Sequence, residues 1–165
     1  MNLISYNWTQ TNTAIQDIAM SMYKDKWRPD YIVGITRGGL VPAVLLSHMV
    51  DIPMHTLCVQ LGTDGLEENT ESNCWMAEDA FGYEKEAKNI LIIDDINRGG
   101  DAMAWIMKDW QASCLPTSEN WDQVWHNNVR FASLLSNPNS IVDTDYFSVE
   151  FDDELKQWIQ FPWET

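Results

Sequence analysis

Two short segments of the sequence carry residue types that can bind phosphate groups. The first, GITRGGLVP, spans residues 34–42. Its glycine pair follows an apolar run and precedes a helical pattern, so backbone N–H groups could approach an anion at a helix N-terminus. Arg37, inside the same turn, adds a guanidinium group whose donors match phosphate oxygens. A plain tight turn with a surface arginine is the alternative that this spacing leaves open.

The second segment, ILIIDDINRGGDA, spans residues 90–102 and is acidic rather than basic. Asp94 and Asp95 follow a buried strand, at the edge where open α/β sheets bind their ligands. Adjacent carboxylates suit a hard cation and the vicinal hydroxyls of a sugar. Gly99 and Gly100 then open a helix and could hold a second phosphate group. The alternative is a solvated acidic turn in which Asp101 caps that helix.

The two turns are more specific as a pair than either is alone. They predict a donor that carries phosphate at both ends, with pyrophosphate at Arg37 and ribose hydroxyls at Asp94 and Asp95. The 5-phosphate would then lie over residues 98–102, at the start of the next helix.

The elements that position these turns follow from the apolar periodicity of the chain. Thr9 is the expected N-cap of a first helix, and residues 40–50 and the segment after residue 100 predict two more. Strands are expected at residues 31–35, 54–60, 89–93, 129–135 and 146–151. Strands that alternate with helices predict one α/β domain over residues 1–165, with a mostly parallel, twisted sheet flanked by helices.

Residues 61–89 interrupt this pattern with eight acidic residues, two lysines and three glycines. Connections of this length are usually functional, so we interpret the segment as a flexible flap. Residues 113–128 are polar and irregular, and the aromatic segment 155–164 has few helix signals.

Composition narrows the classes of partner. The formal charge is −15, from 25 acidic and 10 basic residues, which disfavours nucleic acid and acidic membranes as partners. No apolar run reaches the ~20 residues of a membrane span, and the first ten residues do not resemble a signal peptide. The three cysteines and three histidines show no disulfide or zinc spacing. These features predict a cytoplasmic protein.

The two phosphate-competent segments resemble those of the type I phosphoribosyltransferases, most closely the bacterial members that use purines. RGGLVP matches the pyrophosphate loop of that family, and the apolar strand with its Asp-Asp pair matches the donor signature. The segment from Trp158 to Glu164, WIQFPWE, resembles a carboxyl-terminal Trp-Ile-x-x-Pro-Trp-Asp motif. The resemblance runs in order from about residue 6 to the end. It implies the family's fold, with a flap at about 61–89 and a C-terminal base-binding hood at about 136–165.

The resemblance also implies a role for each matching residue. Pyrophosphate would bind at Thr36, Arg37 and Gly38, and the Thr36–Arg37 peptide would be a cis bond. The residues implied in catalysis are Asp94, Asp95 and Arg98, and those around the 5-phosphate are Asn97, Arg98, Gly99, Gly100, Asp101 and Ala102. Mg²⁺ would be the cofactor, served by Asp95 and Glu164. The base would stack on Trp158, with backbone contacts from Ile159 and an edge contact from Asn137.

Four positions depart from the family pattern. The signature continues with a third aspartate, where this chain has Arg98, or Asn97 if one gap is allowed. The threonines that wrap the phosphate in the family are replaced by Gly99 and Ala102, or by Arg98 and Asp101 with the gap. Loss of a general base costs ~10²–10⁴-fold in rate, which need not abolish a transfer dominated by leaving-group activation. Asn137 stands where the purine enzymes have a lysine.

The function implied is transfer of a 5-phosphoribosyl group from 5-phosphoribosyl-1-pyrophosphate to a purine-like base in purine salvage. The product would be a nucleoside monophosphate, and the family commonly forms homodimers or homotetramers. A degenerate protein on the same scaffold, which senses the donor or a nucleotide without catalysis, is the alternative. Hydrolysis of the donor or of a nucleotide is a third possibility.

Overall fold

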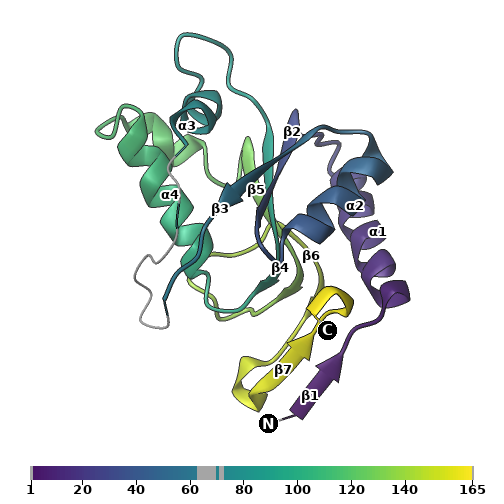
Figure 1. Ribbon diagram of the computed structural model, residues 1–165. Coiled ribbons are helices and arrows are strands. Elements are labelled where there is room, and N and C mark those ends of the chain that lie inside the picture. Colours follow the sequence, from purple (N-terminus) through teal and green to yellow (C-terminus); the bar gives the residue numbers. More distant parts are fainter. Residues whose placement is uncertain (1, 63–69, 71–72, 165) are drawn as a thin grey trace.

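The computed structural model describes residues 2–62, 70 and 73–164 of the 165-residue chain (Figure 1). Its centre is a five-stranded sheet in which every pair of neighbours is parallel. The strand order is β3 (Met54–Cys58), β2 (Tyr31–Thr36), β4 (Ile90–Asn97), β5 (Val129–Ser136) and β6 (Tyr146–Glu150). The predicted α/β fold with a mostly parallel sheet is confirmed.

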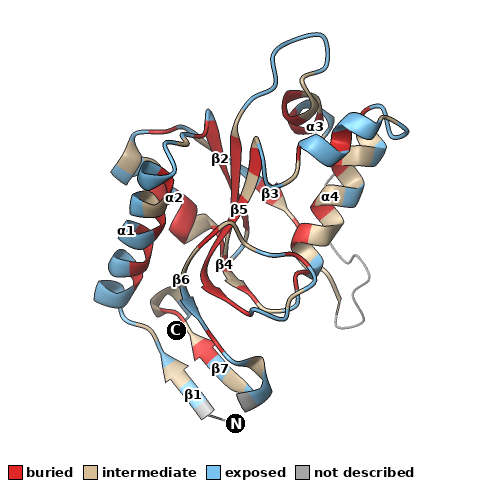
Figure 2. Ribbon diagram, turned by 180° about the vertical axis from the view of Figure 1, so that it is seen from behind, coloured by how far each residue is buried: buried red, intermediate tan, exposed pale blue. Residues whose placement is uncertain are grey.

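Two layers of helices cover the sheet. Helices α1 (Trp8–Lys24) and α2 (Leu40–Val50) lie on one face, and α3 (Cys74–Phe81) and α4 (Asp101–Ser113) lie on the other (Figure 1). Buried residues concentrate on the central strands and on the helix faces that meet them (Figure 2). Among the described helices, none is long and apolar enough to cross a membrane.

The central strands are apolar throughout because both of their faces are covered. Along β4, Ile90 and Ile92 belong to the core under α3 and α4, whereas Leu91 and Ile93 belong to the core under α1 and α2. All four side chains are fully buried. This alternation explains why an uninterrupted apolar run, rather than a period of two, marks the strand in the sequence.

Helix α1 begins earlier than the sequence suggested. Its N-cap is Asn7, whose side chain accepts from the backbone N–H of Gln10 at 2.8 Å. The Gln10 side chain in turn accepts from the Asn7 N–H at 2.9 Å, which completes a capping box. The predicted N-cap, Thr9, is wrong because the reciprocal Asn–Gln pair satisfies the helix end two residues upstream.

A helix that was not expected occupies the second half of the predicted flap. In α3, Met76, Ala77 and Ala80 are fully buried against the core of the α4 face. Asp79, also on α3, is buried and accepts a hydrogen bond from the Tyr31 hydroxyl at 2.9 Å. Glu78 and Asp79 made this stretch look like an acidic loop, although its apolar residues recur at helical spacing. Of the rest of the predicted flap, residues 63–69 and 71–72 lie outside the described residues.

The chain ends meet in a second, smaller sheet. Strand β1 (Asn2–Ser5) pairs in parallel with β7 (Gln157–Gln160), in a register that sets Leu3 opposite Trp158. Figure 1 shows this pair beyond one end of the main sheet, with both termini beside it. Three short 3₁₀ helices complete the elements, at Glu119–Gln123, Asp153–Leu155 and Pro162–Glu164.

The buried carboxylate of Asp79 provides a test of the packing of α3. It accepts from the Tyr31 hydroxyl and pairs with the ammonium groups of Lys85 and Lys88. Asp79→Ala leaves a buried hydroxyl without its partner, so we expect a loss of about 1–3 kcal/mol in the free energy of unfolding. Urea denaturation measures this loss, with the exposed Glu86→Ala as the control. A loss equal to that of the control would contradict the assigned network.

Candidate active site

The turn after β2 has a geometry that only small residues permit. The Thr36–Arg37 peptide bond is cis, as the resemblance implies. A Cβ atom on Gly38 would lie 2.2 Å from the Asp95 Oδ2 atom. Gly38 is therefore a glycine because the turn approaches the acid pair so closely. Arg37 is exposed, and it forms no ion pair with any residue of the described chain.

The two adjacent acids project to opposite sides of the end of β4. They are consecutive residues of a strand, so their side chains alternate between its faces. The Asp95 N–H donates to Asp94 Oδ1 at 2.9 Å, and the Ile96 N–H donates to Asp95 Oδ1 at 2.7 Å. Asp95 is only 9% exposed. Both carboxylates are thus held by local hydrogen bonds at the carboxyl end of the sheet.

Within the part of the chain that the structure describes, neither acid forms an ion pair with a basic group. Burial raises the pKa of Asp94 well above its ordinary range, and repulsion from Asp95 adds to the increase. Burial likewise raises the pKa of Asp95, with a smaller contribution from the charge of Glu164, while hydrogen bonds lower it. A bound cation would relieve this repulsion and favour the ionised carboxylates.

Asp95 faces a cavity of about 670 Å³ at the meeting point of four elements. Residues of the basic turn after β2 and of the C-terminal segment both line it. Two buried polar atoms of its lining residues, Thr36 Oγ1 and Trp163 Nε1, have no hydrogen-bond partner among the described residues. Unpaired buried polar atoms are costly without a ligand or water. The lining residues are Thr36, Arg37, Gly38, Gln60, Asp95, Trp158, Gln160, Trp163 and Glu164.

Asp94 faces a smaller cavity, of about 260 Å³, on the other side of the strand end. The predicted 5-phosphate loop surrounds it, because residues 97–102 all line this cavity together with Asp94. Gly100 adopts a left-handed conformation with φ +86°, and a Cβ there would lie 2.7 Å from the Val142 nitrogen. This glycine lets the chain turn sharply into α4, whose N-terminal N–H groups begin at the cavity.

Two side chains of this loop already have partners within the protein. Asn97 donates to the Val142 carbonyl oxygen at 2.8 Å and to the Ser140 hydroxyl at 3.0 Å. The Arg98 guanidinium forms an ion pair with Asp153 and donates to the Gln157 carbonyl oxygen at 3.2 Å. Their direct contact with a phosphate group stays a prediction.

The structure separates two predicted base-binding residues from the larger cavity. Asn137 is 6% exposed, donates to the Arg98 carbonyl oxygen at 2.7 Å and accepts from the Asn139 N–H at 3.0 Å. Ile159 is 6% exposed and packs in the core beneath α1 and α2. Neither residue is among those that line the cavity, whereas Trp158, which is 57% exposed, does line it. The roles of Asn137 and Ile159 in base recognition stay predictions.

Three residues that line the larger cavity were not among the predicted site residues, although the sequence contains signals for them. Gln160 lies two residues beyond Trp158 in β7, and positions i and i+2 of a strand share a face. Gln60 follows the end of β3, at the same carboxyl edge of the sheet as the turn after β2. Trp163 precedes Glu164 in the C-terminal motif and stacks on Phe161, with ring centroids 4.7 Å apart.

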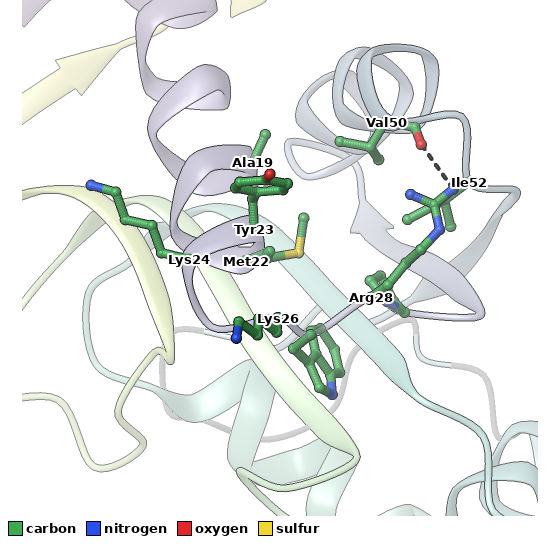
Figure 3. A pocket seen from close by; sticks show the side chains of 10 residues that line it. Ala19, Met22, Tyr23, Lys24, Lys26, Arg28, Val50 and Ile52 are labelled. Carbon is green, nitrogen blue, oxygen red and sulfur yellow. Dashed lines mark hydrogen bonds between the residues drawn. The ribbon is translucent and has the colours of Figure 1, made fainter.

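A further cavity, of about 520 Å³, lies away from these residues, where α1 and α2 end (Figure 3). Its lining is largely apolar and includes Met22, Trp27 and Ile52. Arg28 at its edge donates to the carbonyl oxygens of Val50 and Asp51, each at 3.0 Å. None of the lining residues is a carboxylate, so this cavity lacks the cation ligands found at the end of β4.

Comparison with known proteins decides the family. The phosphoribosyl transferase domain family matches this chain over residues 6–165. The chain belongs to the phosphoribosyltransferase family.

Relatives of this phosphoribosyltransferase include purine enzymes. It is 28% identical over 135 residues to the xanthine-guanine phosphoribosyltransferase of Desulfotalea psychrophila, covering 81% of this chain and 69% of that protein. A purine phosphoribosyltransferase from Pyrococcus horikoshii has a TM-score of 0.68 at 26% identity, over 100% of this chain and 95% of the other. The fold is also that of the xanthine-guanine-hypoxanthine phosphoribosyltransferase of Helicobacter pylori, with a TM-score of 0.70 at 17% identity over 99% and 95% of the chains.

These findings show a transferase enzyme. The match runs through both turns and the C-terminal segment, so it includes all the residues that line the two cavities. The alternative of a degenerate sensor receives no support from these relatives.

The raised pKa of Asp94 predicts that its ionised carboxylate lowers the stability of the folded protein. Because burial raises the folded-state pKa of Asp94, folding favours the protonated carboxyl. This contribution to stability is complete below the ordinary carboxyl pKa of ~4 and is lost as pH rises through the raised value, by at most ~1.4 kcal/mol for each pH unit. We expect Asp94→Asn to be more stable than the wild type in EDTA, by a margin that grows with pH.

Thermal unfolding between about pH 4 and about pH 8 measures this margin. The exposed Asp122→Asn is the matched control, and we expect its margin to stay flat across the range. A margin for Asp94→Asn that is constant or shrinks as pH rises would contradict the assigned repulsion.

Proposed function

We propose that this enzyme transfers the 5-phosphoribosyl group of 5-phosphoribosyl-1-pyrophosphate to a purine base and releases pyrophosphate. The observation that carries the proposal is the pair of cavities on either side of the end of β4. One has an arginine turn and the other a helix N-terminus, with a carboxylate facing each. A sugar that bears phosphate groups at both ends suits this arrangement.

The donor's two anionic ends would occupy different cavities. Pyrophosphate would lie in the larger cavity, where Arg37 is exposed without an ion pair and the buried Thr36 hydroxyl lacks a partner among the described residues. The 5-phosphate would lie in the smaller cavity, at the N-terminus of α4. The ribose would then cross the end of β4, with its hydroxyls near Asp94 and Asp95.

The residues present fit Mg²⁺. Asp95 and Glu164 line the same cavity, and no group of three or more metal-ligating side chains occurs among the described residues. Mg²⁺ commonly uses one or two carboxylates together with substrate phosphates and water. When bound with the donor, the cation would neutralise charge that develops on the leaving pyrophosphate.

The protein's own residues would divide the remaining tasks. The bond between C1 of the ribose and the pyrophosphate oxygen breaks, and a bond from a ring nitrogen of the base to C1 forms. Arg37 and the neighbouring backbone would stabilise the departing charge, while the acid pair would hold the ribose. The proton of the base nitrogen would pass to solvent. The family's third aspartate could otherwise accept it, but this chain has Arg98 at that position, or Asn97 if one gap is allowed.

Trp158 would hold the base. Its side chain is 57% exposed and lines the larger cavity together with residues of the basic turn. An exposed indole at a cavity wall offers a stacking face to a planar ligand. The relatives named for xanthine and guanine make 6-oxopurines the first bases to test. A cytoplasmic location and a dimeric or tetrameric assembly remain proposals.

The central test is release of pyrophosphate from the donor with Mg²⁺, in the presence of xanthine, guanine, hypoxanthine, adenine or orotate. We expect release that depends on a purine and falls by at least ~10²-fold in Asp95→Asn. Release without any base would indicate hydrolysis. Donor binding without release would favour the sensor.

A second prediction isolates the base site. Loss of aromatic stacking in Trp158→Ala should raise the KM for the base about tenfold, while the KM for the donor stays within about twofold. Steady-state kinetics measure both constants. Trp75→Ala, which removes another exposed indole on the far helix layer, is the matched control. Equal effects of the two substitutions would remove Trp158 from the base site.

A further inference from the structure

Among the described residues, the guanidinium of Arg98 contacts the segment that leads into Trp158. Its Nη1 atom forms an ion pair with Asp153, and its Nη2 atom donates to the Gln157 carbonyl oxygen at 3.2 Å. The group also lies over the ring of Phe151, 5.1 Å from the centroid. These three partners span seven residues of the C-terminal hood, so the side chain extends from the donor loop to the hood.

The backbone from which this side chain extends is firmly held. Asn137 donates from its side chain to the Arg98 carbonyl oxygen at 2.7 Å, and its N–H donates to the Asn97 carbonyl oxygen at 2.8 Å. The Ile141 N–H donates to the Gly99 carbonyl oxygen at 3.0 Å. Arg98 therefore begins on a rigid support at the end of β4.

Apart from Arg98, the start of β7 is held mainly by its pairing with β1, within the part of the chain that the structure describes. Strand β7 belongs to a two-stranded sheet with β1, and isolated two-stranded sheets are only marginally stable in water. The far end of β7 is anchored in the core by Ile159 and Phe161, which are 6% and 1% exposed. At the near end, the side chain of Arg98 supplies the polar contacts that join the end of β4 to residues 153–157.

We propose that Arg98 is a positioning residue for the base site: it fixes the start of β7 so that Trp158 stands over the larger cavity. This inference rests on the proposed function. It gives Arg98 a role different from the phosphate contact that its place in the sequence suggested. The two roles are distinguishable because loss of the positioning role would raise the KM for the base, whereas loss of a phosphate contact would raise the KM for the donor.

The contacts also set the size of the effect. The Arg98 and Asp153 side chains are 38% and 42% exposed, so water screens their attraction and the pair is weak. Removing it should loosen the hood without unfolding the domain. We expect the KM for the base to rise about three- to tenfold in Arg98→Ala.

Steady-state kinetics with each substrate varied in turn make the first test. Arg98→Ala and Asp153→Ala should both raise the KM for the base, Arg98→Ala by more, and leave the KM for the donor within about twofold. The double variant should be no worse than Arg98→Ala, because Arg98→Ala already removes the ion pair with Asp153. Arg98→Lys should restore part of the wild-type KM for the base. Its ammonium group can keep the ion pair with Asp153 but has no second nitrogen to donate to the Gln157 carbonyl oxygen.

Arg130→Ala is the matched control. Arg130 also forms an ion pair with an aspartate, Asp25, and lies over an aromatic ring, that of Trp27, at 4.6 Å. Its guanidinium contacts Asp25, just after the end of α1, and the Tyr146 hydroxyl of β6, but none of the residues 151–157 that Arg98 contacts, so both KM values should stay at the wild-type level. A rise in the donor KM for Arg98→Ala, with the base KM unchanged, would overturn the proposal in favour of a phosphate ligand. So would an Asp153→Ala variant with wild-type kinetics.

A second measurement does not require turnover. Amide hydrogen exchange should become faster by about three- to tenfold across residues 153–160 in Arg98→Ala, while exchange in β4 stays unchanged. If the wild type transfers no phosphoribosyl group, the proposed function fails, yet faster exchange in the hood would still support the positioning contact. Unchanged exchange in the hood would overturn it.

Discussion

The turn after β2 passes so close to the Asp95 carboxylate that no side chain fits between them. A Cβ on Gly38 would lie 2.2 Å from Asp95 Oδ2, and one on Gly39 would lie 2.5 Å from the Ile93 carbonyl oxygen. This proximity follows from the parallel pairing of β2 with β4, which sets Gly34 opposite Ile93 and brings both strand ends to one edge. The exposed Arg37 and Asp95 therefore line the same cavity, although they are 58 positions apart in the sequence.

The alternation of side chains along β4 determines how that space is divided. Asp94 and Asp95 face cavities on opposite sides of the strand end, and each cavity has its own phosphate-competent backbone. The acids outnumber the arginines around both cavities, in a chain whose formal charge is −15. For the proposed donor to bind there, a cation would have to accompany it, and that cation would also favour the ionised form of the two aspartates, whose pKa values are raised.

Features encoded within a short stretch could be predicted from the sequence, and contacts between distant segments could not. The turn around Arg37, the strand before Asp94 and the helix at residues 40–50 each carry local apolar and glycine patterns, and the structure contains all three. Helix α3 was missed because acids mask its apolar spacing. The pairing of β1 with β7 joins the two chain ends, and the partner of Arg98 lies 55 residues away at Asp153, so no local pattern reports either contact.

Calorimetric titration of 5-phosphoribosyl-1-pyrophosphate into the wild type and Gly38→Ala, each with and without Mg²⁺, tests the central constraint most directly. A methyl group at residue 38 must displace either the turn or the Asp95 carboxylate. We predict that the wild type binds the donor with a strong dependence on Mg²⁺, and that Gly38→Ala loses at least about tenfold in affinity while remaining folded. Equal affinities of the two proteins, or wild-type binding that is indifferent to Mg²⁺, would contradict the account.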